Sequence, residues 1–549
     1  MTARSTGGTA RRLCSATGWL LLAVAVTWPL ARHLGTRLPI GTEPGSTVPR
    51  FNLWTLRWNA DRINRGWSGY WDAPSFWPST SAFALSEPQP LTGVWFWLLR
   101  MVRLGPVAAY GVIVLVTLAA NGALGSRLAR RLGMGSFAAV AVGVGCLTLQ
   151  FTVNERGVLQ LLALWPMLWV WERVLSYGES PSLTGALTAG LAVAAVFATC
   201  GYSGVFLVLT GVPLLALVLT PAWRSLDWPV SLAQAASGAA VAALGLTSTW
   251  LQVSLTPEVS WSRATILANS ADWAAFTRLV PGPDGQGLSP GWLVMALAVA
   301  GLVVGLSHRA HRRATVAFAV VGVLAMFLAM GLRLSAAGFV PYRFLVEHFG
   351  LDRLRSPFRA AVIAQLVLVL LAGFALDSLA RFRAKATVVR PAPRSGLVAA
   401  LAAILVLAVV VTGRSAGWGS APLSSPEPIR SSRAWVRWLT EHPGGAVAHV
   451  PTVVTGGQEK FVETTGQMLA SLDHGHPILG GYTGFFPDEF AARARLVDQI
   501  GSVEARAALR DLGIRYLVVD LDSPDAPAAR STGVVVEQDG DVLIVDLGN

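Results

Sequence analysis

The sequence predicts a polytopic α-helical membrane protein with about eleven transmembrane helices, followed by an α/β domain outside the membrane. Of its 549 residues, 53% are hydrophobic and only 13% are charged, whereas soluble globular proteins usually carry about a quarter charged residues. Apolar stretches of about 20 residues, the length that crosses a bilayer core, recur along residues 1–412. After residue 412 the composition changes to that of an acidic soluble domain.

The apolar stretches predict the positions of the transmembrane helices. They lie near residues 14–32, 104–124, 136–152, 157–175, 183–200, 203–220, 228–251, 290–306, 314–331, 358–379 and 395–412. The first follows a basic N-terminus, as a signal peptide does, but so many spans follow it that we expect an uncleaved helix. The exact helix count stays open around 183–220, where only Gly201, Tyr202 and Ser203 separate two stretches.

The basic residues between these stretches predict the orientation of the chain. Cytoplasmic loops of membrane proteins are enriched in Lys and Arg, and the short basic loops 307–313 and 380–394 fall on the same side as the basic N-terminus. We therefore expect a multi-pass plasma-membrane protein with a cytoplasmic N-terminus and an extracytoplasmic C-terminal domain. The net charge of +12 is explained by these loops, and we expect no nucleic acid as a partner.

Residues 1–412 form the predicted membrane domain, with large outer loops at 33–103, 252–289 and 332–357. Residues 413–549 carry 17 acidic and 11 basic residues. The runs "AVAHVP", "IRYLVVD", "GVVVEQD" and "DVLIVDL" are rich in β-branched residues and predict strands, while "SSRAWVRWLTEH" and "DEFAARARLVDQI" have helical spacing. Together they predict a small α/β domain.

The first outer loop mixes tryptophans, arginines and carboxylates. Its stretch "FNLWTLRWNADRI" (51–63) predicts a short helix lying on the membrane surface, because its apolar positions do not alternate as in a strand. Trp54 and Trp58 then have two interpretations, an interfacial aromatic belt or a substrate-binding surface. A carboxylate here can act as general base for a sugar hydroxyl or bind a divalent cation. The candidates are Glu43, Asp61 and Asp72.

The loop before residue 360 places several arginines on the outer side, where the charge rule disfavours them. They include Arg353, Arg355 and Arg359. Because a guanidinium group binds phosphate through a planar pair of N–H donors, these residues have two interpretations. They contact ordinary lipid headgroups, or they hold the phosphate of a lipid-linked substrate.

Other motifs carry less chemistry. "VGVGC" (142–146) lies inside an apolar stretch and predicts close helix packing rather than a nucleotide loop. The three cysteines have no metal-ligand spacing. His474 and His476, in "DHGHP", are possible metal ligands, but we expect them to face solvent.

Several segments resemble those of the GT-C membrane glycosyltransferases. The resemblance is carried by "FNLWTLRWNADRI", "NERGVLQLLALWPMLWVWERV", "LRSPFRAAVIAQLVLVLLAGFALDSL", "PILGGYTGFFPDEF" and "ALRDLGIRYLVVD", and the last two are also similar to YfhO-like membrane proteins. It extends over most of the chain. It implies a GT-C-like bundle that transfers a sugar from a polyprenyl-phosphate donor to an envelope acceptor at the outer face.

The resemblance also implies roles for individual residues. The donor phosphate would be held by Arg353, Arg355 and Arg359, and the catalytic carboxylate would be Glu43, Asp61 or Asp72. The substrate-binding candidates are Trp54, Trp58, Glu155, Arg156 and Tyr482. The expected partners are membrane lipids, the lipid-linked sugar donor and a glycan, lipid or protein acceptor. A divalent cation, Mg²⁺ or Mn²⁺, is the one cofactor left open, and no metal ligand is assigned.

The sequence departs from the family at the catalytic acid. The family usually carries an acidic residue just after the first span, where this chain has Ser46 to Arg50; Glu43 comes earlier and Asp61 later. The alternative is therefore a degenerate, non-enzymatic relative that acts as a transporter, flippase or envelope-assembly factor. Transporters place ionisable groups deep within their spans. Asp377, near the inner end of its stretch, is almost the only such acid here, which favours the enzyme.

Overall fold

The computed structural model describes residues 6–41, 45–224, 226–282, 286–335, 337–386, 423–424 and 434–548. The chain divides into two compact units. The first comprises Met1–Arg32, Val112–Trp250 and Glu258–Ala421, and the second comprises His33–Gly111, Leu251–Pro257 and Pro422–Asn549. The first outer loop thus belongs to the same unit as the C-terminal residues. The expected span at 395–412 and the candidate acid Glu43 lie outside the described residues.

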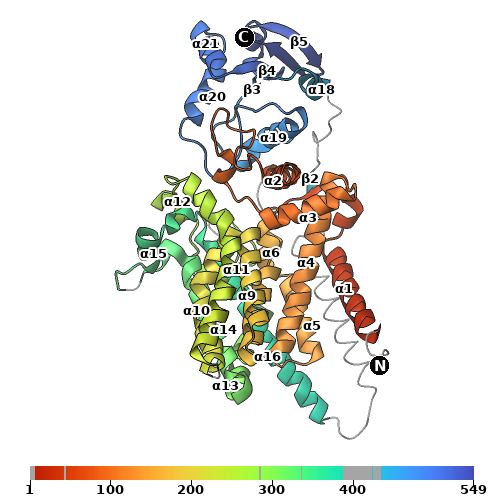
Figure 1. Ribbon diagram of the computed structural model, residues 1–549, viewed down its shortest axis with the longest axis vertical. Helices are drawn as coiled ribbons and strands as arrows, with labels where there is room; N and C mark the ends of the chain where they lie inside the picture. Colours follow the sequence, from red (N-terminus) through yellow and green to blue (C-terminus); the bar gives the residue numbers. More distant parts are fainter. Residues whose placement is uncertain are drawn as a thin grey trace. The chain divides into compact units, whose positions relative to one another are not determined.

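The first unit is built from helices (Figure 1). These are α1 (Thr6–Val26), α4 (Pro106–Arg131), α5 (Ser136–Leu147), α6 (Gln150–Asn154), α7 (Leu159–Leu162), α8 (Trp165–Glu179), α9 (Leu183–Thr199), α10 (Gly201–Arg224), α11 (Trp228–Leu255), α12 (Arg263–Ala268), α13 (Trp292–Ser307), α14 (Arg309–Met330), α15 (Pro341–Phe349) and α16 (Ala361–Ala386). Short 3₁₀ helices include η5 (Leu351–Arg353) and η6 (Pro357–Ala360). α4 begins in the second unit, and α11 ends there.

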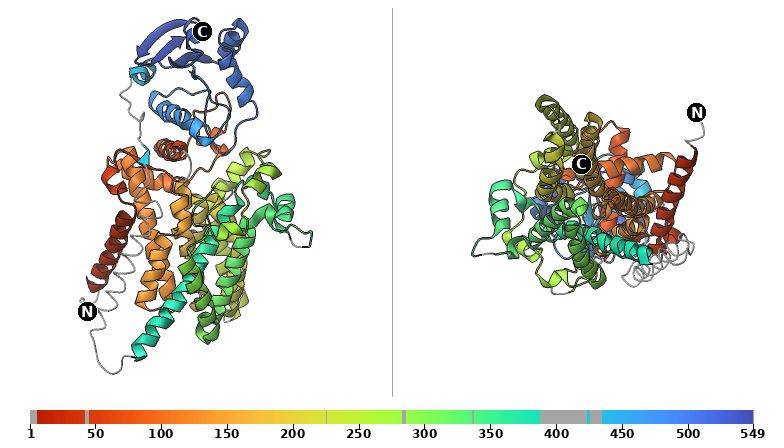
Figure 2. Two further views of the ribbon diagram at one scale, coloured as in Figure 1. Left: turned by 180° about the vertical axis from the view of Figure 1, so that it is seen from behind. Right: turned by 90° about the horizontal axis from the view of Figure 1, so that it is seen from below.

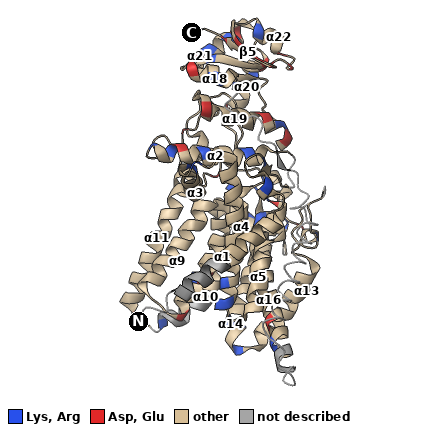
Figure 3. Cartoon of the chain, turned by 90° about the vertical axis from the view of Figure 1, so that its right-hand side faces the viewer, with Lys and Arg blue, Asp and Glu red and all other residues tan. Residues whose placement is uncertain are grey.

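Among the described residues, five helices are long and apolar enough to cross a membrane. They are Pro106–Arg131, Ser136–Asn154, Trp228–Leu255, Arg309–Arg333 and Pro357–Phe382. Shorter apolar helices are Ala16–Val26, Leu183–Thr199, Gly201–Ala216 and Trp292–Ser307. Each coincides with an expected span, and Figure 3 shows few charged residues along the middle of the long helices. α9 and α10 are separate helices, with Cys200 extended between them.

The expected span at 157–175 is interrupted. α7 ends at Leu162 and α8 begins only at Trp165, where Pro166 occupies the first turn of α8, a position that proline favours. The expected total of about eleven spans is therefore not established by the described helices.

α16 contacts α5, α13 and α14, and it is drawn in teal in Figure 2, beside other helices of the first unit. Where α4 meets α5, a Cβ added to Gly143 would lie 2.5 Å from the carbonyl oxygen of Gly122. Only glycine permits this approach of the two backbones, so the packing role predicted for "VGVGC" is confirmed. Gln365 of α16 accepts from the Phe151 amide at 3.0 Å and donates to the Leu288 carbonyl at 2.7 Å, which fixes α6 in place.

The second unit contains a four-stranded sheet with helices beside it (Figure 1). Its elements are β1 (Leu38–Pro39), α2 (Thr47–Asn64), η2 (Ala82–Leu85), α3 (Pro90–Met101), β2 (Leu423–Ser424), α18 (Ala434–Glu441), β3 (Ala446–Val450), η7 (Gln458–Phe461), α19 (Val462–His474), α20 (Phe490–Asp498), α21 (Val503–Asp511), β4 (Ile514–Asp520), α22 (Ala526–Arg530), β5 (Val534–Asp539) and β6 (Val542–Asp546). The strand order is β3-β4-β6-β5, with β3 and β4 parallel and the other pairs antiparallel.

The strands and helices predicted for the C-terminal residues are confirmed. The four β-branched runs form β3 to β6, and the two helical segments form α18 and α20. Buried side chains of β3, β4 and β6 join those of α21 and α22 in one apolar core, which includes Val450, Leu517, Val519 and Val545.

The helix predicted at 51–63 is present as α2. Most of its side chains are buried within the second unit, whereas the sequence predicts a helix that lies on the membrane surface. α2 packs against α3 and α19, and Trp54 and Trp58 are only 2% and 5% exposed. The Arg57 guanidinium of α2 bonds to the Asp473 carboxylate of α19. An interfacial aromatic belt does not fit these two tryptophans, because their rings are enclosed by their own unit.

Candidate functional site

Some of the expected site residues come together in the first unit, around the end of α6. Asn154, the last residue of α6, donates from its side-chain amide to the carbonyls of Leu279 and Gly287 at 3.1 and 2.9 Å. Glu155 follows directly and caps the helix through its backbone amide, 2.9 Å from the Phe151 carbonyl. Segments 125 or more residues apart in the chain therefore set the position of Glu155.

Arg355 and Arg359 are positioned by aromatic residues. The backbone amide of Arg355 donates to the Tyr202 hydroxyl at 2.9 Å, and its guanidinium carbon lies 5.2 Å from the centre of the Trp261 ring. The guanidinium carbon of Arg359 lies 5.1 Å from the centre of the Tyr202 ring. Such cation–π contacts use the face of the guanidinium, whereas its N–H donors lie along its edge. The two side chains are thus held in defined orientations.

The Glu155 carboxylate interacts electrostatically with Arg355 and Arg359. Burial raises its pKa, and the positive charges of Arg359 and Arg355 oppose this rise. Both charges therefore act on Glu155 in the folded chain, although Glu155 lies some 200 residues earlier in the sequence. One carboxylate against two guanidinium groups leaves this cluster with a net positive charge, which attracts an anion.

The remaining candidates of the first unit have other surroundings. Arg156 is buried, which lowers its pKa to about 10, and it donates to the Val153 carbonyl at 2.7 Å. Arg353 ends η5, two residues before Arg355. Asp377, the acid expected near the inner end of its span, accepts from the Gly135 amide at 2.8 Å and pairs with Arg381 at 2.6 Å.

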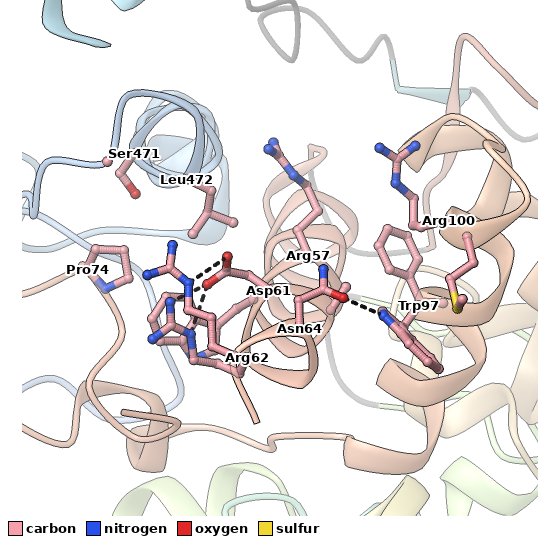
Figure 4. A pocket seen from close by; sticks show the side chains of 15 residues that line it. Arg57, Asp61, Arg62, Asn64, Pro74, Trp97, Arg100, Ser471 and Leu472 are labelled. Atoms are coloured by element: carbon pink, nitrogen blue, oxygen red, sulfur yellow. Dashed lines mark hydrogen bonds and ion pairs between the residues drawn. The ribbon is translucent and has the colours of Figure 1, made fainter. Parts of the chain in front are cut away.

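The second unit contains a pocket of about 560 Å³ between α2, α3 and α19. Figure 4 shows its lining, in which Asp61 faces Arg62 and the Trp97 indole bonds to Asn64. The arginines that line the pocket are Arg57, Arg62, Arg65 and Arg100. Of the two catalytic candidates among the described residues, Asp61 lines this pocket and Asp72 does not.

Asp61 is engaged by two neighbours on its own helix. One of its oxygens accepts from Nε of Arg62 at 2.9 Å, and the other accepts from Nε of Arg65 at 3.3 Å. The Arg62 guanidinium also lies 4.1 Å from the centre of the Trp58 ring. The pairing with Arg62 considered from the sequence is therefore present, and it is extended by Arg65.

The other site candidates of the second unit, Asp72, Trp54 and Tyr482, make contacts that stabilise the fold. Asp72 accepts from the Ser81 backbone amide at 2.9 Å and so closes a turn. The Trp54 ring stacks on the Phe51 ring with centres 5.6 Å apart. The Tyr482 ring packs edge-on against the same Phe51 ring, with centres 5.5 Å apart. The Gly-rich loop that contains Tyr482 thus packs on the first outer loop.

The expectation that His474 and His476 face solvent is wrong. They are only 5% and 3% exposed, because α18, α19 and β3 enclose them. Both ring nitrogens of His476 lie 2.9 Å from backbone carbonyl oxygens, those of Gly445 and Leu439. Within the described ranges, no group of three or more His, Cys, Asp or Glu residues could hold a metal ion.

Sequence reasoning missed several residues of these two sites. Tyr202 was noticed only as part of a short turn, and Trp261 and Arg100 were not singled out. Aromatic residues that orient an arginine leave no local pattern, because they come from distant segments. The only usable signal was the density of Arg and Trp in the outer loops.

No family model and no curated protein sequence matches the chain. Solved structures do. The arabinofuranosyltransferase AftD from Mycobacteria matches 98% of this chain with 17% identity and a TM-score of 0.56. The match covers 40% of AftD, so the chain spans about two fifths of that protein.

ArnT from Cupriavidus metallidurans matches over nearly the whole of both chains. Its structure bound to undecaprenyl phosphate covers 97% of this chain and 98% of ArnT, with 15% identity and a TM-score of 0.53. The apo structure gives 17% identity and a TM-score of 0.52. These neighbours are GT-C glycosyltransferases, and this chain therefore has the GT-C glycosyltransferase fold.

Proposed function

We propose that the protein is an integral membrane glycosyltransferase that takes its sugar from a polyprenyl-phosphate donor and transfers it to an envelope acceptor. The observation that carries the proposal is the cluster of Glu155, Arg355 and Arg359. It is a defined, positively charged site in a chain with the fold of an enzyme whose structure is bound to undecaprenyl phosphate.

The donor phosphate binds along the N–H edges of Arg355 and Arg359. Their faces rest on Trp261 and Tyr202, which reduces the entropy lost when the side chains are fixed on a ligand. Glu155 keeps the two like charges together before the donor arrives. Arg353 adds a third positive charge next to them in the chain. Arg156, with its guanidinium bonded to the Val153 carbonyl, shapes this end of the site.

In the transfer step the oxygen of an acceptor hydroxyl attacks the anomeric carbon of the sugar. A new glycosidic bond forms, and the bond between this carbon and the donor's phosphate oxygen breaks. The polyprenyl phosphate leaves with the electron pair, and a carboxylate takes the proton of the attacking hydroxyl. The positive cluster stabilises the charge that grows on the leaving phosphate.

Glu43 is our first choice for the carboxylate. Asp61 accepts from two guanidinium groups and Asp72 from a backbone amide, so both already have structural partners. Glu43 follows the first span closely in the sequence. A divalent cation stays a candidate for this acid. Trp58, Trp54 and Tyr482, proposed from the sequence for substrate binding, would act indirectly, by packing the first outer loop.

The non-enzymatic alternative of a transporter or flippase has less support. Asp377, the acid that such a carrier would use within a span, accepts from the Gly135 amide and pairs with Arg381. These partners give Asp377 a structural role at the end of its helix.

The test is binding of undecaprenyl phosphate to the purified full chain in detergent. A hydrogen bond to a charged group contributes about 1.5–3 kcal/mol. Arg355→Gln and Arg359→Gln should therefore each weaken binding by at least ~10-fold. The matched control is Arg343→Gln, because Arg343 is an exposed arginine of the same loop that pairs with Glu347; its affinity should equal that of the wild type. Equal affinity of all three variants would contradict the proposed donor site.

A further inference from the structure

The pocket between α2, α3 and α19 has a charge imbalance that the donor site does not explain. Four arginines line it, together with a single carboxylate, Asp61. Asp473 pairs with Arg57 and is not among the lining residues. The walls of the pocket therefore carry more positive than negative charge.

Two of the four arginines are already committed to structural bonds. Arg62 binds Asp61 through Nε and one terminal nitrogen, donates to the Ser68 carbonyl through the other at 3.0 Å, and rests on Trp58. Arg57 uses its terminal nitrogens on Asp473 and on the Leu469 carbonyl. These two residues build the pocket.

Arg65 and Arg100 have donors left for a ligand. Arg65 bonds to Asp61 through Nε at 3.3 Å, and its side chain is 64% exposed. Arg100 uses one terminal nitrogen on the Leu104 carbonyl. A guanidinium group has five N–H donors, so both residues, which line the pocket, keep further donors.

Arg57 and Arg100 also repel each other. Burial lowers the pKa of Arg100, and the positive charge of Arg57 lowers it further. A bound anion would relieve this repulsion. The Trp97 indole, fixed by its bond to Asn64 at 2.8 Å, and the side chain of Met101 add an apolar wall.

We propose that this pocket binds a phosphate ester, with its phosphate on Arg65 and Arg100 and its organic part against Trp97. Guanidinium groups pair with phosphate through two parallel bonds, and about 560 Å³ lies within the usual range for small-ligand sites. The ester belongs either to a phospholipid headgroup or to a phosphorylated sugar. The proposal is independent of the donor site, because the two sites share no residue.

The test is titration calorimetry on the full chain in a zwitterionic detergent. One arm uses glucose 1-phosphate with glucose as its uncharged control. The other uses short-chain phosphatidylglycerol, with the matching short-chain diacylglycerol, which lacks the phosphate, as its control. We expect one of the two phosphate esters to bind at least tenfold more tightly than its control, and the arm that binds identifies the source. Binding in neither arm overturns the proposal.

The matched variants locate the binding. Arg65→Gln/Arg100→Gln should weaken the ester at least tenfold with only a small change in melting temperature, because both side chains are largely solvent-exposed and an exposed pair such as Arg65–Asp61 contributes little to stability. Arg103→Gln removes an exposed arginine that does not line the pocket and should leave binding unchanged. Equal losses in both variants would mean general charge attraction and would contradict the pocket.

The same variants separate this proposal from the donor site. Undecaprenyl phosphate binding should depend on Arg355 and Arg359, and it should persist in Arg65→Gln/Arg100→Gln. If undecaprenyl phosphate is lost only in the pocket variant, the pocket is supported as a phosphate-ester site and the donor site is contradicted.

Discussion

At the scale of single residues, the carboxylates of this chain divide into those with structural partners and those still available for chemistry. Glu172 of α8 is fully buried and binds Arg127 at 3.1 Å, Arg131 at 3.3 Å and Arg173. In the sequence, Glu172 stands beside Arg173 at the end of a mostly apolar stretch. Its three partners come from two helices, so their meeting could not be predicted from spacing.

Glu172→Gln should destabilise the protein markedly. The substitution removes the charged hydrogen bonds of a fully buried carboxylate to three partly exposed arginines, and one such bond contributes about 1.5–3 kcal/mol. Thermal unfolding followed by size-exclusion fluorescence should show a clearly lower midpoint. Glu179→Gln is the control, since this exposed residue pairs with Arg131 alone and such a pair contributes about 0–1 kcal/mol. Equal midpoints for the two variants would show that the buried network is unimportant.

The three candidate bases make a second residue-scale prediction. Glu43→Gln should reduce transfer by about 10²–10⁴, the usual contribution of a general base, with expression unchanged. Asp61→Asn should mainly lower stability, because Arg62 and Arg65 lose their carboxylate. Quantifying the transferred sugar in membranes distinguishes these effects. If all three acids can be changed to amides together without loss of product, the non-enzymatic alternative takes the place of the enzyme.

At the scale of elements, local sequence patterns predict helices and strands correctly, but they do not predict which side chains become buried. The runs that form β3 to β6 are β-branched, and their strand character is a local property. The burial of α2 depends on α19, which lies about 400 residues later. His474 and His476 were misjudged for the same reason, because β3 and α18 cover them. Arg355 and Arg359 were predicted as a phosphate site, but their contacts with Tyr202 and Glu155 required the fold.

The buried histidines of the C-terminal sheet predict a pH-dependent stability. Burial lowers the pKa of His449 to about 3. The pKa of His474 is lowered first by burial and then by the charges of His449 and His476. When the pH falls below about 6.5, the ordinary pKa of histidine, His449 becomes protonated in the unfolded chain but stays neutral in the folded chain. The free energy of unfolding should therefore fall by about 1.4 kcal/mol per pH unit for this residue until about pH 3.

His449→Phe tests this linkage. The ring nitrogens of His449 have no hydrogen-bond partner among the described residues, so a phenyl ring keeps the packing on Trp435 without removing a bond. Amide hydrogen exchange of β4 at several pH values should give a slope shallower by about 1.4 kcal/mol per pH unit. The exposed His442 provides the control, His442→Gln, with an unchanged slope. If the free energy of unfolding of His449→Phe kept the pH dependence of the wild type, the claim that His449 stays neutral in the folded protein would be contradicted.

At the scale of the whole molecule, the fold class followed from composition and span length, and the GT-C fold of the structural neighbours agrees with it. The orientation of the chain across the membrane remains a prediction from its basic loops. On a cysteine-free background, a membrane-impermeant thiol reagent should label Asp284→Cys in intact cells and spare His311→Cys. The reverse pattern would place the loop 307–313 outside and overturn the orientation.

The central claim is that Arg355 and Arg359 hold the donor phosphate of a sugar-transfer reaction. The most direct measurement is the sugar-linkage composition of the envelope in cells that lack this protein, complemented with the wild type or with Arg355→Gln/Arg359→Gln. We expect one linkage to be lost in its absence, to return with the wild type and to stay absent with the double variant, while Arg343→Gln restores it fully. An unchanged composition, or full restoration by the double variant, would contradict the claim.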